Sequence, residues 1–325
     1  MHSSALRLFT PIEADLLAVE ERIERVTDIE PPILRDALRH VMLAPGKRIR
    51  PALTIACGRL FRDATASLHS MAAAVEYLHT ATLIHDDVVD QPSLRRGAPA
   101  LYSLVGNSVA LLAGDYLFAQ AAATASETNN LRIMRLFAES VMTLCAGQID
   151  ECARIGDERQ EIDRDSYYRT IDAKTAALFV LACHAGAILG EASLAQTEAL
   201  RRYGRLLGLA FQIVDDVLDL VGDESAMGKP VGSDLRQGLV TLPVIYLRDE
   251  IAEDLLRQAF SDDGAKEQAI EQIADRARES NAVRRAYAEA RHLCDEAAAE
   301  LEALPKGSHR ELLWELTRTV IDRPS

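Results

Sequence analysis

The chain of 325 residues has few of the residues that separate short strands and turns. It contains 17 glycines, 11 prolines and only 5% aromatic residues. Runs that alternate apolar and polar residues over a useful strand length are missing, whereas alanine, leucine, glutamate and arginine are abundant. This composition argues against an architecture of many short strands and predicts long helices.

The chain also lacks an excess of positive charge. Its 36 Lys and Arg residues are outnumbered by 50 Asp and Glu, which gives a formal net charge of −14. A nucleic-acid-binding surface normally needs a basic patch or stripe, and the sequence contains no such block. Any anionic ligand must therefore be held by local cations against the field of the whole protein.

Cysteine is scarce and shows no paired spacing. The five cysteines are Cys57, Cys145, Cys152, Cys183 and Cys294. Their spacing does not match a metal-binding pattern, and an odd number suits a reducing cytoplasm better than a disulfide framework. They are interpreted as small, buried apolar residues.

No secretory signal or membrane span is recognisable in the sequence. Residues 1–11 have neither a charged start nor a long apolar core. The longest apolar stretch, Thr175 to Gly190, is shorter than the ~20 residues that span a bilayer, and it contains His184. It is predicted to be a buried core helix, and the protein is expected to be soluble and cytoplasmic.

Helical periodicity continues through most of the chain, and no change of composition marks a linker. Predicted breaks lie at residues 44–46, 62–63, 91–99, 106–107, 156–165, 222–238, 261–264 and 305–308. Leu131 to Arg154 and Glu198 to Val221 are among the predicted helices. The pattern predicts one all-α domain over residues 1–325, in which some helices are apolar nearly all round and must be surrounded by others.

Two acidic clusters with the same spacing are the strongest chemical signal. They consist of Asp86, Asp87 and Asp90 within LIHDDVVD, and of Asp215, Asp216 and Asp219 within QIVDDVLD. Residues four apart are neighbours on a helix, where like charges destabilise it. One such cluster could be a solvated helix end, but two copies after apolar turns indicate a compensating ligand. Mg²⁺ is the natural candidate, because it prefers oxygen ligands and completes its shell with substrate phosphate.

Basic residues accompany the acidic clusters. They are Lys47 and Arg50 within GKRIRP at a predicted helix start, His79 two turns before the first cluster, and Arg95 and Arg96 in the loop after it. Each alone is typical of surface charge or, for His79, of a core histidine. Together with two metal-binding faces they indicate clamps for diphosphate groups, since arginine forks match phosphate oxygens and a helix start favours anions.

These motifs resemble those of the trans-polyprenyl diphosphate synthases. HTATLIHDDVVD, followed by RRG, is similar to the family's first aspartate-rich motif, and FQIVDDVLD is similar to its second. GKRIRP, Lys174-Thr175 and Gly228-Lys229-Pro230 resemble further family blocks in the same order. The similarity covers about residues 40–250, which form the family's catalytic core, whereas residues 251–325 match only in helical character.

The resemblance implies an isoprenoid synthase helical bundle with a central apolar tunnel, working as a homodimer. It implies a prenyltransferase that joins isopentenyl diphosphate head to tail to an allylic diphosphate, such as farnesyl diphosphate, by Mg²⁺-assisted ionisation. The implied metal ligands are Asp86, Asp87, Asp90 and Asp215, with Asp216 and Asp219 in support. The implied substrate contacts are Arg95, Lys174, Thr175, Gln212 and Lys229 for the allylic diphosphate, and Lys47, Arg50, His79 and Arg96 for isopentenyl diphosphate. Asp86, Asp90, Lys174, Asp215 and Lys229 would act in catalysis.

The residues below the first cluster predict the product length. Ala81 and Thr82 lie about 6 to 7.5 Å deeper along the helix than Asp86, and Leu78 lies one turn further. In short-chain members a bulky aromatic commonly closes the pocket here, whereas Ala81 leaves room for a longer tail. We expect an all-trans product of hexaprenyl to decaprenyl length, such as a quinone side-chain precursor. A farnesyl or geranylgeranyl diphosphate synthase is the alternative.

Two places depart from the family pattern. Leu239 follows Gly238 where lysine is usual, which would remove one donor to the allylic diphosphate. Residues 147–151 (GQIDE) replace a more usual Gly-Glu pattern and are given no role. A single-substrate terpene cyclase is disfavoured by the second diphosphate clamp, and a non-catalytic partner subunit is disfavoured by the two intact clusters.

Overall fold

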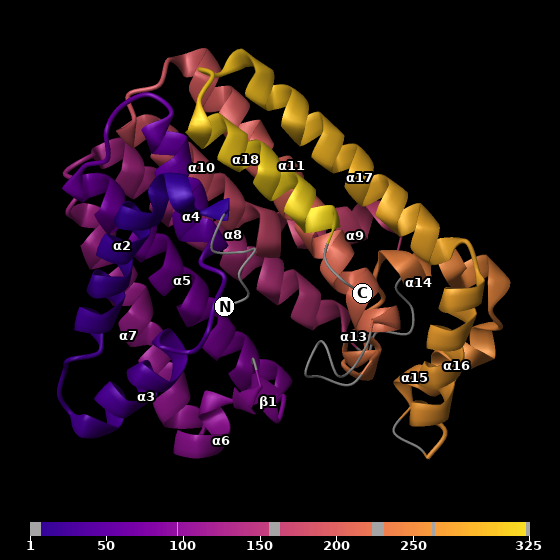
Figure 1. The fold of residues 1–325 in the computed structure, drawn as a ribbon. Coiled ribbons are helices and arrows are strands. Elements are labelled where there is room, and N and C mark those ends of the chain that lie inside the picture. The colour runs from indigo at the N-terminus through magenta and orange to yellow at the C-terminus, as the bar shows by residue number, and fades with distance from the viewer. Residues whose placement is uncertain (1–7, 96, 156–162, 223–230, 262–263, 323–325) are drawn as a thin grey trace. The chain divides into compact units, whose positions relative to one another are not determined.

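The computed structural model describes residues 8–95, 97–155, 163–222, 231–261 and 264–322 (Figure 1). Helices make up nearly all of this part, which confirms the predicted all-α fold class. The α-helices are α2 (Glu13–Val26), α3 (Pro32–Met42), α4 (Ile49–Arg59), α5 (Ala66–Asp90), α6 (Leu101–Val105), α7 (Asn107–Ser126), α8 (Leu131–Arg154), α9 (Arg164–Ile171), α10 (Ala177–Leu189), α11 (Leu194–Val221), α13 (Ser233–Arg236), α14 (Leu242–Leu247), α15 (Glu253–Phe260), α16 (Lys266–Glu279), α17 (Ala282–Glu300) and α18 (Ser308–Ile321). Short turns of other helix types are η1 (Thr10–Ile12), η2 (Asp172–Ala176), η3 (Arg248–Glu250) and η4 (Leu301–Ala303).

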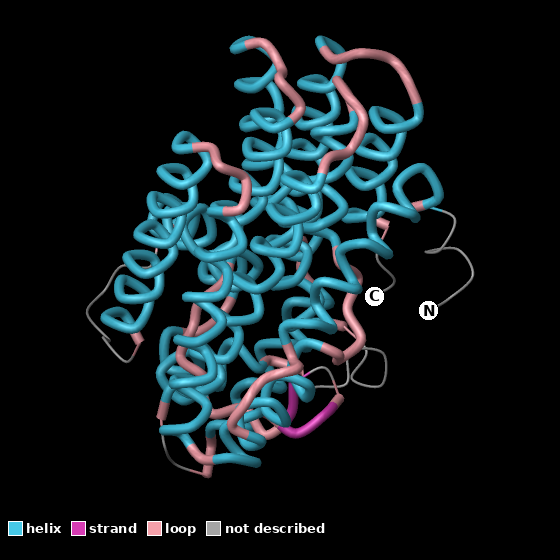
Figure 2. Tube along the Cα trace, turned by 90° about the vertical axis from the view of Figure 1, so that its left-hand side faces the viewer, coloured by secondary structure: helices cyan, strands magenta, loops and turns pink. Residues whose placement is uncertain are grey.

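A two-stranded antiparallel hairpin contains the only strands among the described residues (Figure 2). β1 (Leu94–Arg95) pairs with β2 (Ala98–Pro99) inside the predicted break that follows the first acidic cluster. Each strand has two residues, which is too short for an alternating pattern to be visible in the sequence.

The ends of the long helices follow local capping signals. Thr65 accepts a backbone hydrogen bond at the start of α5, and Gln91 ends this helix in a left-handed conformation with φ 51°. α8 has the predicted bounds. α11 ends at Val221 as predicted but begins earlier than predicted, because Ser193 and Gln196 form a reciprocal capping box.

The chain forms two compact units, each assembled from separate stretches of sequence. The first comprises Met1–Val141, Leu178–Gly204 and Glu300–Leu316, and the second comprises Met142–Ala177, Arg205–Ala299 and Thr317–Ser325. The helices α8, α11 and α18 contribute residues to both units. The expectation of a single domain over residues 1–325 stays a prediction.

In the first unit α5 is packed on several sides. It contacts α2, α4 and α7, and every residue from Met71 to Leu78 is buried, as expected of a helix that is apolar nearly all round. α4 and α10 approach each other so closely that a Cβ on Gly186 would lie 2.3 Å from the carbonyl oxygen of Thr54. The helix that carries the first acidic cluster is therefore held by a densely packed core.

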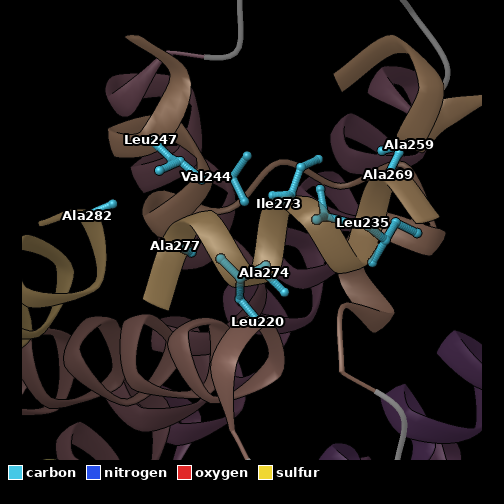
Figure 3. Close-up of a cluster of buried hydrophobic side chains, with 11 residues drawn as sticks. Leu220, Leu235, Val244, Leu247, Ala259, Ala269, Ile273, Ala274, Ala277 and Ala282 are labelled. Atoms are coloured by element: carbon cyan, nitrogen blue, oxygen red, sulfur yellow. The ribbon is translucent and has the colours of Figure 1, made fainter. Parts of the chain in front are cut away.

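In the second unit a cluster of small and branched apolar side chains joins six helices (Figure 3). Its members come from α11, α13, α14, α15, α16 and α17, and they are Leu220, Leu235, Val244, Leu247, Ala259, Ala269, Ile270, Ile273, Ala274, Ala277 and Ala282. Leu220 follows directly on Asp219, so this cluster anchors the end of α11 where the second acidic cluster lies.

The run Arg164–Leu189, formed by α9, η2 and α10, is long and apolar enough to cross a membrane by length and composition. It is longer than the predicted apolar stretch because the helix continues through η2. Since 61% of its most apolar window is buried inside the protein, it also meets the description of a core helix.

Candidate functional site

The first acidic cluster occupies the last turns of α5. Asp86 and Asp90 are half-buried, whereas Asp87 is only 4% exposed. The C-terminal end of a helix carries partial negative charge, which adds to the repulsion among the three carboxylates. This end of α5 therefore requires compensating positive charge.

Arg95 supplies part of that charge. The turn at Gln91 leads into the hairpin, and Arg95 on β1 reaches back to donate two hydrogen bonds to Oδ1 of Asp87, the one from Nε at 2.8 Å. The predicted substrate ligand Arg95 is thus oriented by the buried member of the cluster. This geometry favours a supporting role for Asp87, and its assignment as a metal ligand stays a prediction.

The second acidic cluster occupies the last turns of α11. Asp216 is 3% exposed, and both of its carboxylate oxygens accept hydrogen bonds. The hydroxyl of Tyr167 donates to Oδ2 at 2.6 Å, and the amide of Gln212 donates to Oδ1 at 2.7 Å. Burial raises the pKa of Asp216 to about 7; the charges of Asp215 and Asp219 act in the same direction, while the two hydrogen bonds oppose it.

Asp219 is not equivalent to its counterpart Asp90, because it is buried. Its Oδ2 accepts the N–H of Asp234 at 3.0 Å, and its carbonyl oxygen accepts the N–H of Gly232 at 2.7 Å. It therefore holds the chain where α13 begins, and its supporting role at a metal site stays a prediction. Asp215 is half-buried, as Asp86 and Asp90 are.

Lys174 and Thr175 lie in η2, a π-helical turn between α9 and α10. Such turns occur frequently at functional sites. The hydroxyl of Thr175 donates to Oε1 of Gln212 at 2.6 Å, and the same side-chain amide donates to Asp216. A chain of hydrogen bonds therefore runs from η2 through α11 to Tyr167 on α9.

The π turn is also fixed against α8. Lys174 forms an ion pair with Glu151, and a Cβ on Gly147 would lie 2.6 Å from the Cβ of Ala173. The sequence analysis assigns no role to Glu151 or to Tyr167. The sequence does contain a signal for Glu151, because Gly147 and Glu151 are four residues apart and so share one face of α8.

Three of the predicted isopentenyl diphosphate contacts belong to the first unit. Lys47 is exposed just before α4, Arg50 lies in the first turn of α4, and half-buried His79 lies seven residues before Asp86 on α5. The guanidinium of Arg50 is 4.9 Å from the ring centroid of Phe179. Arg96, Lys229 and the block Gly228-Lys229-Pro230 lie outside the described residues.

The donor set suits a hard cation that shares its ligands with a substrate. No three His, Cys, Asp or Glu side chains in the described part of the chain are arranged to hold a metal ion by themselves. Mg²⁺ is usually bound by one or two carboxylates together with substrate phosphates. Half-buried Asp86 and Asp90 in the first unit fit that mode, and so, taken by itself, does half-buried Asp215 in the second.

The all-helical fold, which here places an aspartate cluster near the C-terminal end of one long helix in each unit, is the fold of solved isoprenyl synthases. The chain belongs to the polyprenyl synthetase family, which it matches over residues 31–276.

Similar proteins extend over nearly the whole chain. A prenyl transferase from Synechocystis sp. is 35% identical over 98% of this chain and 99% of its own length. Heptaprenyl diphosphate synthase component 2 from Geobacillus stearothermophilus is 34% identical over 95% of this chain and 96% of its own. A polyprenyl synthase from Caulobacter crescentus CB15, crystallised with calcium and isoprenyl diphosphate, is 34% identical and superposes with a TM-score of 0.93 over 99% of this chain and 98% of its own. The names of further similar proteins range from short-chain and geranylgeranyl synthases to octaprenyl, solanesyl and decaprenyl synthases.

The raised pKa of Asp216 predicts how stability depends on pH. Between the ordinary value of 3.8 and about 7, the folded protein keeps a proton on Asp216 that the unfolded chain has released. The contribution of this group to stability therefore decreases as the pH rises through that window. Without divalent cations, Asp216→Asn should remove the contribution and change the slope of unfolding free energy by up to about 1.4 kcal/mol per pH unit.

Urea unfolding at several pH values between 3.8 and about 7 measures the two slopes. Asp254→Asn is the control, because Asp254 is exposed on α15 and should leave the slope unchanged. Parallel slopes for wild type and Asp216→Asn would show that Asp216 titrates normally.

Proposed function

We propose that the chain is a Mg²⁺-dependent prenyltransferase that adds isopentenyl diphosphate head to tail to an allylic diphosphate. One observation carries the proposal: the first unit combines half-buried Asp86 and Asp90 with the cations Lys47 and Arg50 and with His79. Carboxylates for a cation and basic groups for a diphosphate are what a two-substrate reaction needs. Membership of the polyprenyl synthetase family supports the same reaction.

The first step breaks the C–O bond of the allylic diphosphate. Bound Mg²⁺ supplies positive charge that stabilises the departing diphosphate. Asp86, Asp90 and Asp215 are assigned as its ligands, with Asp87, Asp216 and Asp219 in support. Lys174 and Arg95, held in place by Glu151 and Asp87, donate to the leaving group, while Thr175, Gln212 and Lys229 complete the contacts to this substrate.

The second step joins the two substrates. The double bond of isopentenyl diphosphate attacks the allylic cation, and one carbon–carbon bond forms. Lys47, Arg50, His79 and Arg96 hold the diphosphate of this substrate, so that the reacting carbons are oriented before ionisation. A proton lost to the released diphosphate leaves a new double bond, and the product is an allylic diphosphate five carbons longer.

We propose a product of hexaprenyl to decaprenyl length. Ala81 and Leu78 are fully buried in the first unit, and neither is aromatic. Heptaprenyl, octaprenyl, solanesyl and decaprenyl diphosphate synthases among the similar proteins support this range. A short-chain product is the alternative that a product analysis must exclude.

The decisive experiment incubates this chain alone with Mg²⁺, farnesyl diphosphate and labelled isopentenyl diphosphate, and then resolves the products by length. Chains longer than geranylgeranyl support both the reaction and the product range. Products that end at geranylgeranyl diphosphate would support the proposed reaction but overturn the proposed product length. No incorporation, with farnesyl or a shorter primer, would favour a non-catalytic subunit, and the name "component 2" of two relatives makes this control necessary.

Phenylalanine in place of Ala81 or Leu78 is expected to shorten the products and leave the first addition intact, because an aromatic ring would block the path of the growing tail. The same product assay measures the shift. Leu17→Phe on the exposed face of α2 is the control and should leave the chain lengths unchanged. Unaltered products from both core variants would contradict the assigned tail path.

Tyr167→Phe is expected to weaken activity and the activation by Mg²⁺ by about 10- to 100-fold, the usual effect of removing a group that orients a metal site. The variant loses the hydrogen bond to buried Asp216. Tyr168→Phe is a matched control on the same helix, because that hydroxyl donates to Glu289 instead. Equal Mg²⁺ activation curves for the two variants would show that Tyr167 does not orient the metal site.

We further propose a homodimer in which α7 pairs with a second copy of itself. The exposed face of α7 carries Leu111, Leu112, Ala119 and Ala123 at helical spacing, with Asp115 as the one charged residue among them, and a largely apolar helix needs a covering partner. Leu112 is 64% exposed. Sedimentation should find wild type dimeric and Leu112→Glu monomeric, with Leu194→Glu on α11 remaining dimeric; a monomeric wild type would refute the pairing.

We also propose that the protein works in the cytoplasm and that residues 1–325 act as one catalytic domain. All five cysteines are free thiols, as expected in a reducing compartment. Cys57, Cys183 and Cys294 are buried as predicted, whereas the prediction of burial is wrong for Cys145 and Cys152, which are exposed on α8. The shared helices α8, α11 and α18 support the single domain.

A further inference from the structure

Arg48 stands between two proposed substrate contacts, and its backbone is unusual. It precedes α4 in the left-handed conformation, with φ 48° and ψ 35°, which residues other than glycine seldom adopt. Its carbonyl oxygen accepts the N–H of Ala52 at 3.0 Å and so begins the helix. Lys47 is the residue before it, and Arg50 follows two residues later. The direction of both cationic side chains therefore depends on this one backbone conformation.

The side chain of Arg48 points into the first unit and binds three helices. Nε donates to Oε1 of Glu20 on α2 at 2.7 Å, Nη1 donates to Oε1 of Glu76 on α5 at 2.8 Å, and Nη2 donates to the carbonyl oxygen of Met42 on α3 at 2.8 Å. The side chain of Arg48 is 12% exposed and that of Glu76 only 4%. A buried guanidinium with this many acceptors permits one orientation of the loop.

Glu76 connects this ion pair to the proposed site. It lies on α5 three residues before His79, so the two side chains are neighbours on one helix face. His79 in turn lies seven residues, about two turns, before Asp86. Arg48 thus ties the loop that carries Lys47 and Arg50 to the helix turn that carries His79.

We propose that Arg48 is a positioning residue for isopentenyl diphosphate: its ion pair with Glu76 and Glu20 fixes Lys47 and Arg50 at a set distance from His79. This inference rests on the proposed function, which assigns those three side chains to that substrate. Arg48 itself does not touch substrate. It acts by fixing the separation of the groups that do.

A merely structural role predicts a different result from a positioning role. If Arg48 only stabilised the helices around it, its replacement would lower the unfolding temperature and the amount of folded enzyme, and the KM of both substrates would stay unchanged. If Arg48 positions Lys47 and Arg50, its replacement raises the KM for isopentenyl diphosphate alone, because the allylic substrate is bound by other residues.

The experiment compares Arg48→Lys and Glu76→Gln with wild type in the full-length enzyme. Lysine keeps the charge but cannot reach three acceptors with a rigid fork. We expect the KM for isopentenyl diphosphate to rise about tenfold or more in both variants, because Lys47 and Arg50 would no longer be correctly placed for its diphosphate. The KM for farnesyl diphosphate and kcat should stay near wild type. Thermal unfolding of each variant is measured in parallel.

Arg202→Lys is the matched control, since Arg202 makes a bidentate ion pair with Glu300 in the same unit at 2.7 Å for both bonds. It should leave both KM values unchanged. If Arg48→Lys does not fold, Glu20→Gln replaces it, because Glu20 is the more exposed of the two carboxylate partners.

Each outcome is decisive. A selective rise in the KM for isopentenyl diphosphate in the Arg48 and Glu76 variants supports the inference. Unchanged KM values, or equal rises for both substrates, in an active wild-type background overturn the inference and leave the proposed function intact. An inactive wild type overturns both.

Discussion

The structure is organised around an electrostatic conflict: three carboxylates stand near the C-terminal end of α5, and three more near that of α11. Mutual repulsion and the negative end of the helix both oppose this arrangement. In each cluster the second aspartate is buried and hydrogen-bonded, Asp87 by Arg95 and Asp216 by Tyr167 and Gln212. The burial of these two side chains fixes the rotation of each helix and leaves the first aspartate of each cluster only half-buried.

The groups proposed to bind substrate are themselves held by other side chains. Lys174 lies in a π turn and is paired with Glu151, and the neighbouring Thr175 is bonded to Gln212. The loop before α4 is held by the buried ion pair of Arg48. This arrangement suits catalysis of an ionisation, because groups that are already oriented need not reorganise when charge develops.

The two acidic motifs look alike in sequence but differ in the structure. Asp219 is buried and accepts a backbone N–H of the following chain, whereas its counterpart Asp90 is half-buried at the last residue of α5. The difference arises because the backbone N–H groups of Gly232 and Asp234 donate to Asp219 at the end of α11, whereas the chain after α5 leads into the hairpin. Equal spacing on a helix therefore does not ensure equal chemical roles.

The sequence by itself determined the all-α class, the bounds of α8, the acidic clusters and the family, because helical periodicity and aspartate spacing are local properties of the chain. Only the tertiary structure decided that Asp87 pairs with Arg95, that Tyr167 supports Asp216, and that Glu151 pairs with Lys174. Those partners lie 8, 49 and 23 residues apart and come from different elements. Their pairing depends on how the elements pack, and spacing along one helix carries no information about it.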